Sequence, residues 1–313
     1  MSCTAPEAVV FIGDKMKFLG RKYYLCFENR IPTPNEQLRL ERLAKHGVDL
    51  SVFPMPCGSC MGCRIVYSRD YALRGVCESE LSDYNYFLTL TYDNDHVPVS
   101  PSGKLTLRKS DIRSFLVRLR LVLGSGLRTL GCAEYGERTH RPHYHIIFFG
   151  KQIPDLVPHS KKGNNILYES EIINRAWGHG AVLIGEANFT TIKYVAGYVT
   201  KKVKGRNAEN YYGDREHETL VAVTRNGGGI GSHWYDRFFR DLLINGSLVS
   251  RGKEWPIPRY FRNKLKKDHP DLYAVVLESM KKKACEKDRL EYTVERQTVK
   301  ESVNKKTIKE RDI

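Results

Sequence analysis

The chain has 313 residues, with 51 Lys and Arg against 36 Asp and Glu, so its formal net charge is +15 with neutral histidines. Hydrophobic residues make up 41% of the sequence and aromatic residues 11%, which is enough to bury a core and excludes a wholly disordered chain. No apolar run approaches the roughly 20 residues of a membrane-spanning helix. Asp14 and Lys15 follow the first apolar stretch too closely for a good signal peptide. We therefore expect no membrane partner, a cytoplasmic location, and eight cysteines that are thiols or metal ligands.

The positive charge favours a polyanionic partner, because each Lys or Arg placed on a phosphate releases a counterion. Residues 251–313 hold 18 Lys and Arg and 11 Asp and Glu, so about half of the surplus lies in the last fifth of the chain. The sequence also has 18 Tyr and 12 Phe, and basic grooves lined by aromatic rings suit single-stranded nucleic acid. Composition alone favours this interpretation only moderately over a charge that serves solubility.

A cysteine cluster is the first motif in chain order. Cys57, Cys60 and Cys63 have the spacing C-x₂-C-x₂-C, with glycines between them, and the sequence that follows over 64–81 predicts a helix. Three thiolates suit Zn²⁺, which takes four ligands. The candidates for the fourth ligand are Cys26, Cys77 and His46. The alternative is three reduced thiols in a turn before a helix, and the spacing is a poor fit to an iron–sulfur cluster.

The predicted elements that follow describe an α+β fold. Residues 86–92 predict a strand, residues from 111 onward a helix, and residues 130–135 and 143–149 two strands joined by a polar turn. Further helices are predicted over 169–177 and 190–203, and a charged helix or disordered tail from Met280. This order predicts an antiparallel sheet flanked by helices. We expect an N-terminal region with the cysteine cluster over 1–80, a core over 81–205, and a basic C-terminal extension over 206–313.

The segment HRPHYHIIFFG at 140–150 is the central motif. On a strand, His143 and His145 share one face while Tyr144 points into the opposite layer. Two imidazoles with a carboxylate suit a divalent cation such as Mg²⁺ or Mn²⁺, and Glu134 near the end of the preceding strand is the candidate carboxylate. Weaker candidates are Glu137, His140 and His96. The alternative is a surface strand whose histidines only form hydrogen bonds, but the apolar run 146–149 favours a rigid central strand.

Two tyrosines on a later helix supply a nucleophile. Tyr194 and Tyr198 are spaced i, i+4 and share one helical face with Lys201. A phenol needs a polarised phosphate or a nearby ammonium to attack at neutral pH. The alternative is two amphipathic core tyrosines. With the histidines, the pattern indicates attack on a DNA phosphate that leaves a 5′-phosphotyrosine and a free 3′-hydroxyl, in a linkage that can be resealed.

Several motifs in order give the chain a specific resemblance. HRPHYHIIFF, FLTLTYD at 87–93 and YVAGYVTKK at 194–202 resemble the HUH endonuclease superfamily, named for its His-hydrophobe-His motif. The chain is most similar to the rolling-circle replication initiators of microviruses, in particular the gokushovirus branch. PCGSCMGCR, GIGSHWYDRFFRD and IPRYFRNK also resemble that branch, and the resemblance covers about 55–265.

The resemblance implies an HUH endonuclease with a ferredoxin/RRM-like core in the cytoplasm of a bacterial host. It implies nicking of replicative-form DNA at an origin, displacement synthesis by a host polymerase, and joining of the displaced single strand into a circle. A host helicase is implied too, since the sequence has no Walker-type phosphate loop. By position, His143, His145 and Glu134 would be the metal ligands, Tyr194 and Tyr198 the nucleophiles, and Lys201 an assisting cation.

Two other functions stay open at this point. A relaxase or tyrosine transposase of the same superfamily would use the same chemistry on conjugative or mobile DNA. A non-catalytic nucleic-acid-binding protein with a zinc site and a basic tail would bind DNA whether or not Tyr194 and Tyr198 were present.

Overall fold

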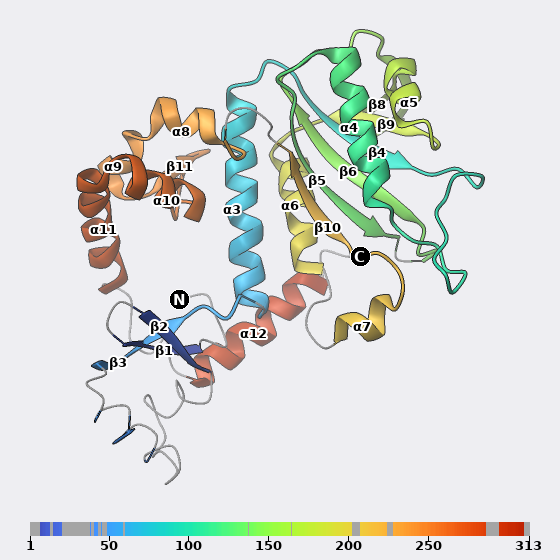
Figure 1. The fold of residues 1–313 in the computed structure, drawn as a ribbon. Coiled ribbons are helices and arrows are strands. Elements are labelled where there is room, and N and C mark those ends of the chain that lie inside the picture. The colour runs from blue at the N-terminus through green and yellow to red at the C-terminus, as the bar shows by residue number, and fades with distance from the viewer. Residues whose placement is uncertain are drawn as a thin grey trace. The chain divides into compact units, whose positions relative to one another are not determined.

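The computed structural model describes residues 7–12, 15–20, 38, 41–42, 45, 49–58, 60–136, 138–163, 165–201, 207–223, 228–285 and 294–309. The chain divides into two compact units (Figure 1). One unit comprises Met1–Val66 and Lys287–Ile313, and the other comprises Tyr67–Glu286. Within the described residues, no helix combines the length and apolar character that a membrane crossing requires.

The first unit contains a small antiparallel sheet with the strand order β2-β1-β3. Its strands are β1 (Glu7–Ile12), β2 (Lys15–Gly20) and β3 (Asp49–Met55). The long helix α3 (Met61–Glu80) begins in this unit, directly after the cysteine cluster. The helix α12 (Val294–Lys309) belongs to the same unit.

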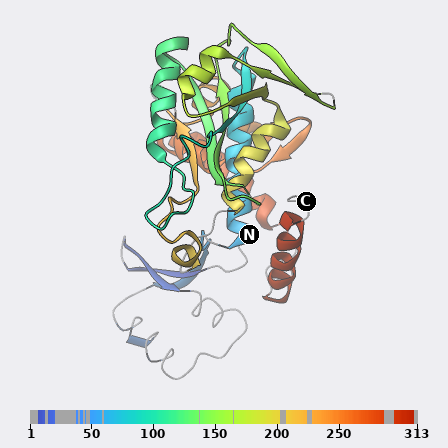
Figure 2. The same ribbon diagram turned by 90° about the vertical axis from the view of Figure 1, so that its right-hand side faces the viewer.

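The second unit is built on a seven-stranded antiparallel sheet with the order β10-β5-β6-β4-β9-β8-β7. Its strands are β4 (Asn85–Thr91), β5 (Arg128–Tyr135), β6 (Pro142–Phe149), β7 (Val157–Lys162), β8 (Asn165–Glu169), β9 (Val182–Glu186) and β10 (Thr219–Val223). The β7–β8 hairpin extends away from the rest of the sheet (Figure 2). The strands β5, β6 and β4 lie at the centre, where both faces are covered.

Alternation along the central strands separates the two faces. Leu88 and Leu90 of β4 pack with Phe115 of α4 (Lys109–Leu123) and Trp177 of α5 (Glu171–Trp177), so these two helices cover one face. The other face packs against α6 (Phe189–Lys201), which contributes Val195 to a second apolar cluster. Polar residues of β4 and β6 that turn toward α6 therefore lie between a rigid sheet and a helix (Figure 1).

The chain after residue 206 forms a packed helical region. It contains α7 (Asn207–Tyr212), α8 (Ser232–Phe238), α9 (Asp241–Asn245), β11 (Leu248–Ser250), β12 (Lys253–Trp255), α10 (Arg259–Asp268) and α11 (Pro270–Cys285). Trp234, Phe261 and Val276 form its own apolar core together with Leu73 of α3. This region is therefore a folded part of the second unit, joined to the sheet by a buried ion pair between Arg128 and Glu78.

The predicted α+β class with an antiparallel sheet is confirmed. The helix from residue 111 begins two residues earlier, at Lys109, because the Glu216 carboxylate accepts the Lys109 N–H (3.1 Å) and the Ser110 hydroxyl donates to Asp111. The strand β10 lies beyond the predicted end of the core at residue 205, yet it pairs with β5. The predicted division at residues 80 and 205, and the ferredoxin/RRM-like topology, stay predictions.

Candidate metal and nucleophile site

Glu134, His143 and His145 form a cluster of possible metal ligands at one end of the central sheet. Glu134 Oε1 lies 2.5 Å from His143 Nε2 and 3.1 Å from His145 Nε2. One ligand atom from each residue lies within 4.8 Å of the other two. The side chains of Glu134 and His143 are only 12% and 19% exposed. Both imidazoles thus direct Nε2 at one carboxylate oxygen, which is the convergence that a single cation needs.

The register of the central strands accounts for this convergence. Glu134 on β5 lies directly opposite His143 on β6, and His143 and His145 lie opposite Thr91 and Thr89 on β4. Side chains opposite one another in antiparallel strands share a face and approach closely. Tyr144, between the two histidines, is buried on the opposite face, as alternation predicts.

Neighbouring polar groups fix the orientation of both imidazoles. The Thr89 hydroxyl lies 3.1 Å from His145 Nδ1, and His143 Nδ1 lies 3.1 Å from the carbonyl oxygen of Arg141. A carbonyl can only accept, so His143 carries its proton on Nδ1 and leaves Nε2 for a ligand when the ring is neutral. Such outer contacts fix ring orientation at metal sites.

The metal-free cluster holds a charged pair. Burial acts to raise the pKa of Glu134, but hydrogen bonds from His143 and His145 outweigh it and hold that pKa below its usual value. Burial acts to lower the pKa of His143, but the hydrogen bond and charge of Glu134 raise it. A bound cation would replace the proton on His143 as the positive partner of this carboxylate.

Tyr194 and Tyr198 of α6 lie against the histidines. Their ring centroids are 5.5 Å and 5.6 Å from that of His145, which stacks between Tyr198 and Phe87. The Tyr198 hydroxyl donates a hydrogen bond to that of Tyr194. Tyr194 is 47% exposed whereas Tyr198 is 8% exposed. Burial and the charge of Glu134 raise the pKa of Tyr198.

The other sequence candidates lie apart from the cluster or cannot be placed. Lys201 is the last residue of α6, and its side chain lies outside what the structure describes, as does Glu137. His96 bonds to the Asp93 carboxylate at an exposed position, and His140 is exposed in the turn before β6. Neither of these two histidines belongs to the ligand cluster.

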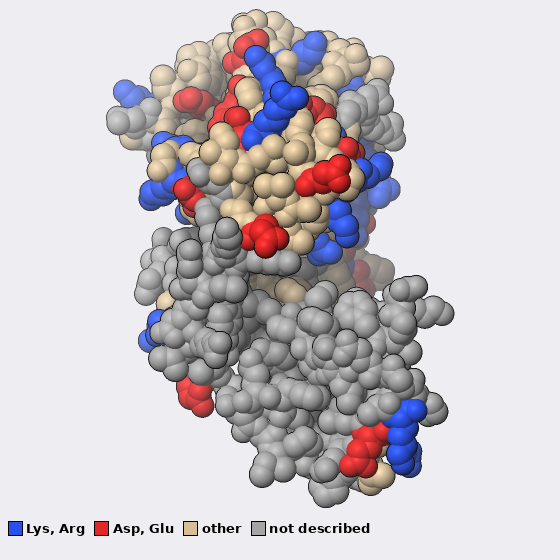
Figure 3. All heavy atoms as spheres, turned by 90° about the vertical axis from the view of Figure 1, so that its left-hand side faces the viewer, with Lys and Arg blue, Asp and Glu red and all other residues tan. Residues whose placement is uncertain are grey.

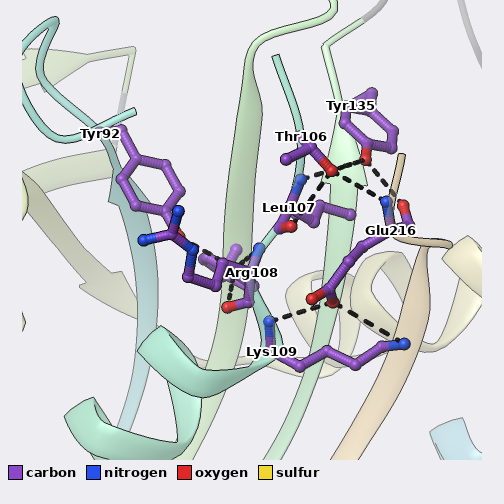
Figure 4. Close-up of polar contacts among 8 residues, drawn as sticks. Tyr92, Thr106, Leu107, Arg108, Lys109, Tyr135 and Glu216 are labelled. Atoms are coloured by element: carbon purple, nitrogen blue, oxygen red, sulfur yellow. Dashed lines mark hydrogen bonds and ion pairs between the residues drawn. The ribbon is translucent and has the colours of Figure 1, made fainter. Parts of the chain in front are cut away.

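Two loops hold the strand ends next to the cluster (Figure 4). The Tyr135 hydroxyl donates to the carbonyl oxygen of Glu216 (2.7 Å) and accepts from the N–H of Leu107 (3.1 Å). On the next strand, the Tyr144 hydroxyl donates to the carbonyl oxygen of Arg108 (2.8 Å). Each of these tyrosines neighbours a ligand in sequence, so the loops help to fix the strand positions from which the ligands project.

The predicted cysteine cluster is also assembled. The sulfur atoms of Cys57, Cys60 and Cys63 all lie within 4.8 Å of one another. The Cys60 N–H donates to Cys57 Sγ (3.3 Å), and Gly58 takes a positive φ of 73° that lets the chain turn between them. Cys77 lies about 21 Å further along the axis of α3, which excludes it as the fourth ligand. Cys26 and His46 lie outside the described residues.

Comparison with known proteins places the site in a family. The family model of the replication-associated protein ORF2 matches residues 85–203, a range that contains both the ligand cluster and the two tyrosines. The chain is 32% identical over 235 residues to "Replication-associated protein VP4" of Bdellovibrio phage phiMH2K, and the match covers 71% of each chain. The chain belongs to the family of microvirus replication-associated proteins. The predicted resemblance to these proteins is confirmed.

Two more members of the replication-associated family show similar agreement. The protein "Replication-associated protein ORF4" of Chlamydia phage 1 is 32% identical over 232 residues, which cover 71% of this chain and 56% of that one. The protein "Replication-associated protein ORF2" of Spiroplasma virus 4 is 29% identical over 231 residues, or 69% of each chain. No solved structure matched the chain significantly.

Sequence reasoning missed the residues that surround the ligands. Phe87 and Thr89 are both within the motif FLTLTYD, and their alternation with Leu88 indicated a shared face. Nothing in the local pattern showed that this face would meet His145, because that contact depends on the pairing of β4 with β6.

Proposed function

We propose that this replication-associated protein is a site-specific endonuclease that nicks one DNA strand at an origin through a tyrosine. The observation that carries the proposal is the position of two phenol rings within 6 Å of the ring of a histidine in the ligand cluster. Tyrosines and ligands come from elements separated in the chain, so their meeting is a property of the fold. A purely structural tyrosine pair has no reason to border a convergent Glu-His-His set.

The donor set fits a divalent cation such as Mg²⁺ or Mn²⁺. Glu134, His143 and His145 offer one carboxylate oxygen and two imidazole nitrogens that already converge, and Mn²⁺ accepts both donor types. When bound there, the cation would polarise the scissile phosphate and offset its charge. The strand register, Thr89 and the Arg141 carbonyl hold the ligand atoms in place.

Tyr194 is the nucleophile of the first cleavage. It is the exposed member of the pair, and its oxygen accepts the hydrogen bond that Tyr198 donates, which stabilises a developing phenolate. The Tyr194 oxygen forms a bond to phosphorus and the bond from phosphorus to the 3′-oxygen breaks. The phenol gives up its proton and the 3′-oxygen leaves as a hydroxyl, so one phosphodiester replaces another. Tyr198 is left for the second transfer, and Lys201 follows on the same helix as the assisting cation.

The free 3′-hydroxyl serves as a primer, and the phosphotyrosine keeps the bond energy for the joining of the displaced strand into a circle. The partners are single-stranded and replicative-form origin DNA, with a host helicase and polymerase in the bacterial cytoplasm. A relaxase or transposase would share the chemistry, but the microvirus relatives favour replication. A non-catalytic DNA-binding protein would not need two hydroxyls beside the ligands.

A second metal, Zn²⁺, would be held by Cys57, Cys60 and Cys63. Three sulfurs within 4.8 Å of one another and an N–H to sulfur bond are typical of a thiolate site. These residues open α3 and lie in the first compact unit, so this metal would support folding of that unit.

The experiment that tests the proposal measures a covalent adduct between the protein and single-stranded origin DNA in the presence of Mn²⁺. The wild type should give an adduct stable to denaturation, and His143→Ala should lose the adduct while it keeps DNA binding. An exposed histidine outside the cluster provides the control, so His96→Ala should form the adduct as the wild type does. A folded His143→Ala variant with full adduct formation would overturn the proposal.

A further inference from the structure

A second group of cationic side chains lies in the second unit, where α10 meets α3. The backbone N–H of Arg259, the first residue of α10, donates to the Asp70 carboxylate on α3 (2.9 Å). Arg262 follows one turn into α10, and Arg69 and Arg74 flank Asp70 on α3. Three guanidinium groups and a single carboxylate therefore belong to this junction.

None of the three guanidinium groups has a carboxylate partner among the described residues. The Nε atoms of Arg69 and Arg262 are buried and have no hydrogen-bond acceptor within that part of the chain. A buried donor without an acceptor costs free energy, and a charged donor costs more. Burial, together with the charge of Arg262, lowers the pKa of Arg69, so the two cations oppose each other at this junction.

Arg74 is held in a fixed position. Its guanidinium carbon lies 4.9 Å from the ring centre of Tyr71 and 4.3 Å from that of Tyr260, and its Nε donates to the carbonyl of Ile230 (2.8 Å). A Cβ at Gly229 would lie 2.7 Å from an Nη atom of Arg74, so only glycine leaves room for the guanidinium there. The Arg74 terminal Nη atoms donate to no described residue.

We propose that Arg69, Arg74 and Arg262 form a phosphate-binding site that holds a backbone phosphate of the DNA outside the nicking centre. The guanidinium fork matches a phosphate, and a phosphate would supply the acceptors that the buried Nε atoms lack. The exposed ring of Tyr67, one turn before Tyr71 on α3, gives a surface on which an adjacent base can stack.

The arrangement favours a built site over a general electrostatic surface. Basic and acidic side chains are interspersed on the face of the described residues that Figure 3 shows, so no field of one sign covers that face. Asp70 is occupied by the backbone of α10 and leaves two of the three positive charges unbalanced. That the phosphate comes from DNA rests on the proposed function, whereas the affinity for phosphate rests on the geometry alone.

The test compares DNA binding by the full-length protein and by Arg69→Gln/Arg262→Gln. The probe is a labelled mixed-sequence single strand without divalent cation, titrated over a series of NaCl concentrations. The variant should bind roughly tenfold more weakly at low salt, and the slope of log K against log salt should become shallower by about 0.7 for each phosphate that the variant no longer holds. The control Arg113→Gln/Arg175→Gln removes the same charge from exposed positions on α4 and α5 and should change both values less.

A second measurement separates the two sources of phosphate and detects loss of folding. The melting temperature of the wild type should rise in sodium phosphate relative to NaCl of equal ionic strength, and the rise should vanish in the Gln variant. A DNA effect without a rise in phosphate assigns the site to the nucleic acid only. Should the Gln variant not fold, Arg69→Lys/Arg262→Lys keeps the charge, loses the fork, and should lose the phosphate-dependent rise. Equal DNA affinity and equal phosphate response in all of the folded variants would overturn the site.

The adduct assay at saturating DNA keeps this inference separate from the nicking proposal. The Gln variant should still form the adduct, because the arginines do not touch the ligand cluster. Adduct formation with unchanged binding would defeat the phosphate site alone. An arginine effect on binding in a wild type that forms no adduct would defeat the nicking proposal alone.

Discussion

At the scale of single residues, the ligand set was predictable and its surroundings were not. Alternation along a strand is a local rule, so the sequence was enough to place His143 and His145 on one face and Tyr144 on the other. Glu134 followed from the hairpin, whose register proved to set it opposite His143. The contact of Thr89 with His145 depends on a strand 56 residues away, and no local pattern predicts it.

Thr89 gives a prediction that separates ring orientation from ligation. The substitution Thr89→Val keeps the shape of the side chain but removes the hydroxyl 3.1 Å from His145 Nδ1. Loss of such an outer contact lowers metal affinity by about 10- to 100-fold. Isothermal titration with Mn²⁺ should show this loss, while adduct formation returns at saturating Mn²⁺. Thr91→Val, whose hydroxyl bonds instead to the carbonyl of Ala181, is the matched control and should bind Mn²⁺ as the wild type does.

At the scale of elements, the strands and helices with clear periodicity lie close to their predicted ranges, and the elements of the C-terminal part do not follow from local pattern. The strands β4, β5 and β6 and the helices α5 and α6 match the predicted segments to within about two residues at most ends. The strand β10 was not predicted, because its role depends on pairing with β5 across some 80 residues. The core of α8, α10 and α11 includes Leu73 of α3, a contact that the basic composition of this region conceals.

The buried pair of Arg128 and Glu78 joins the sheet to α3. Their side chains are 7% and 5% exposed, and Glu78 also accepts the N–H of Gly231 (2.6 Å). Glu78→Gln leaves the guanidinium without its counter-charge, so we expect the free energy of unfolding to fall by about 3 kcal/mol. Urea denaturation measures this change. Glu171→Gln, which breaks an exposed pair with Arg175 on α5, should leave the midpoint unchanged, and equal effects of the two substitutions would contradict the assignment.

The start of α5 depends on a carboxylate outside the helix. Asp155 accepts hydrogen bonds from the Ser170 hydroxyl (2.5 Å) and the N–H of Ile172 (3.0 Å). Burial acts to raise the pKa of Asp155, but these donors outweigh it and hold the pKa below its ordinary value. The stabilisation is therefore present above the unfolded-state pKa of about 3.9 and is lost as the pH falls through the lower folded-state value.

Asp155→Ala should accordingly lower the melting temperature at pH 7, and its difference from the wild type should shrink in acid below that range. Thermal melts over a pH series measure the difference. Asp83→Ala, at an exposed aspartate before β4, should show no such pH-dependent gap. A gap for Asp155→Ala that is constant down to the most acidic sample would show that the carboxylate charge has no part in the cap.

Metal removal tests the cysteine cluster. If Cys57, Cys60 and Cys63 hold Zn²⁺, a zinc chelator should lower the melting temperature of the wild type, because the bound metal stabilises the folded state. Cys60→Ser should melt earlier and respond little to the chelator. An unchanged wild-type melting curve, together with absence of zinc by elemental analysis, would remove the metal from this cluster.

At the scale of the whole molecule, the meeting of α6 with the β5–β6 hairpin was predicted from chemistry and not from pattern. A ligand set and two phenols were expected to act together, but sequence spacing does not tell which face of the sheet a later helix covers. The structure brings Tyr194 and Tyr198 onto the face that carries His145. Hydroxyl exposure, which decides between the two phenols, depends on the packing of α6 and could not be predicted from their spacing.

The most direct test of the account is to identify the residue that carries the DNA after a single cleavage with Mn²⁺. Mass spectrometry of the digested adduct should place the phosphate on Tyr194, with none elsewhere. Tyr194→Phe should suppress this adduct, Tyr198→Phe should keep it, and the double variant should form none. An adduct of full yield in the folded double variant, or a phosphate on any residue other than these two tyrosines, would contradict the central claim.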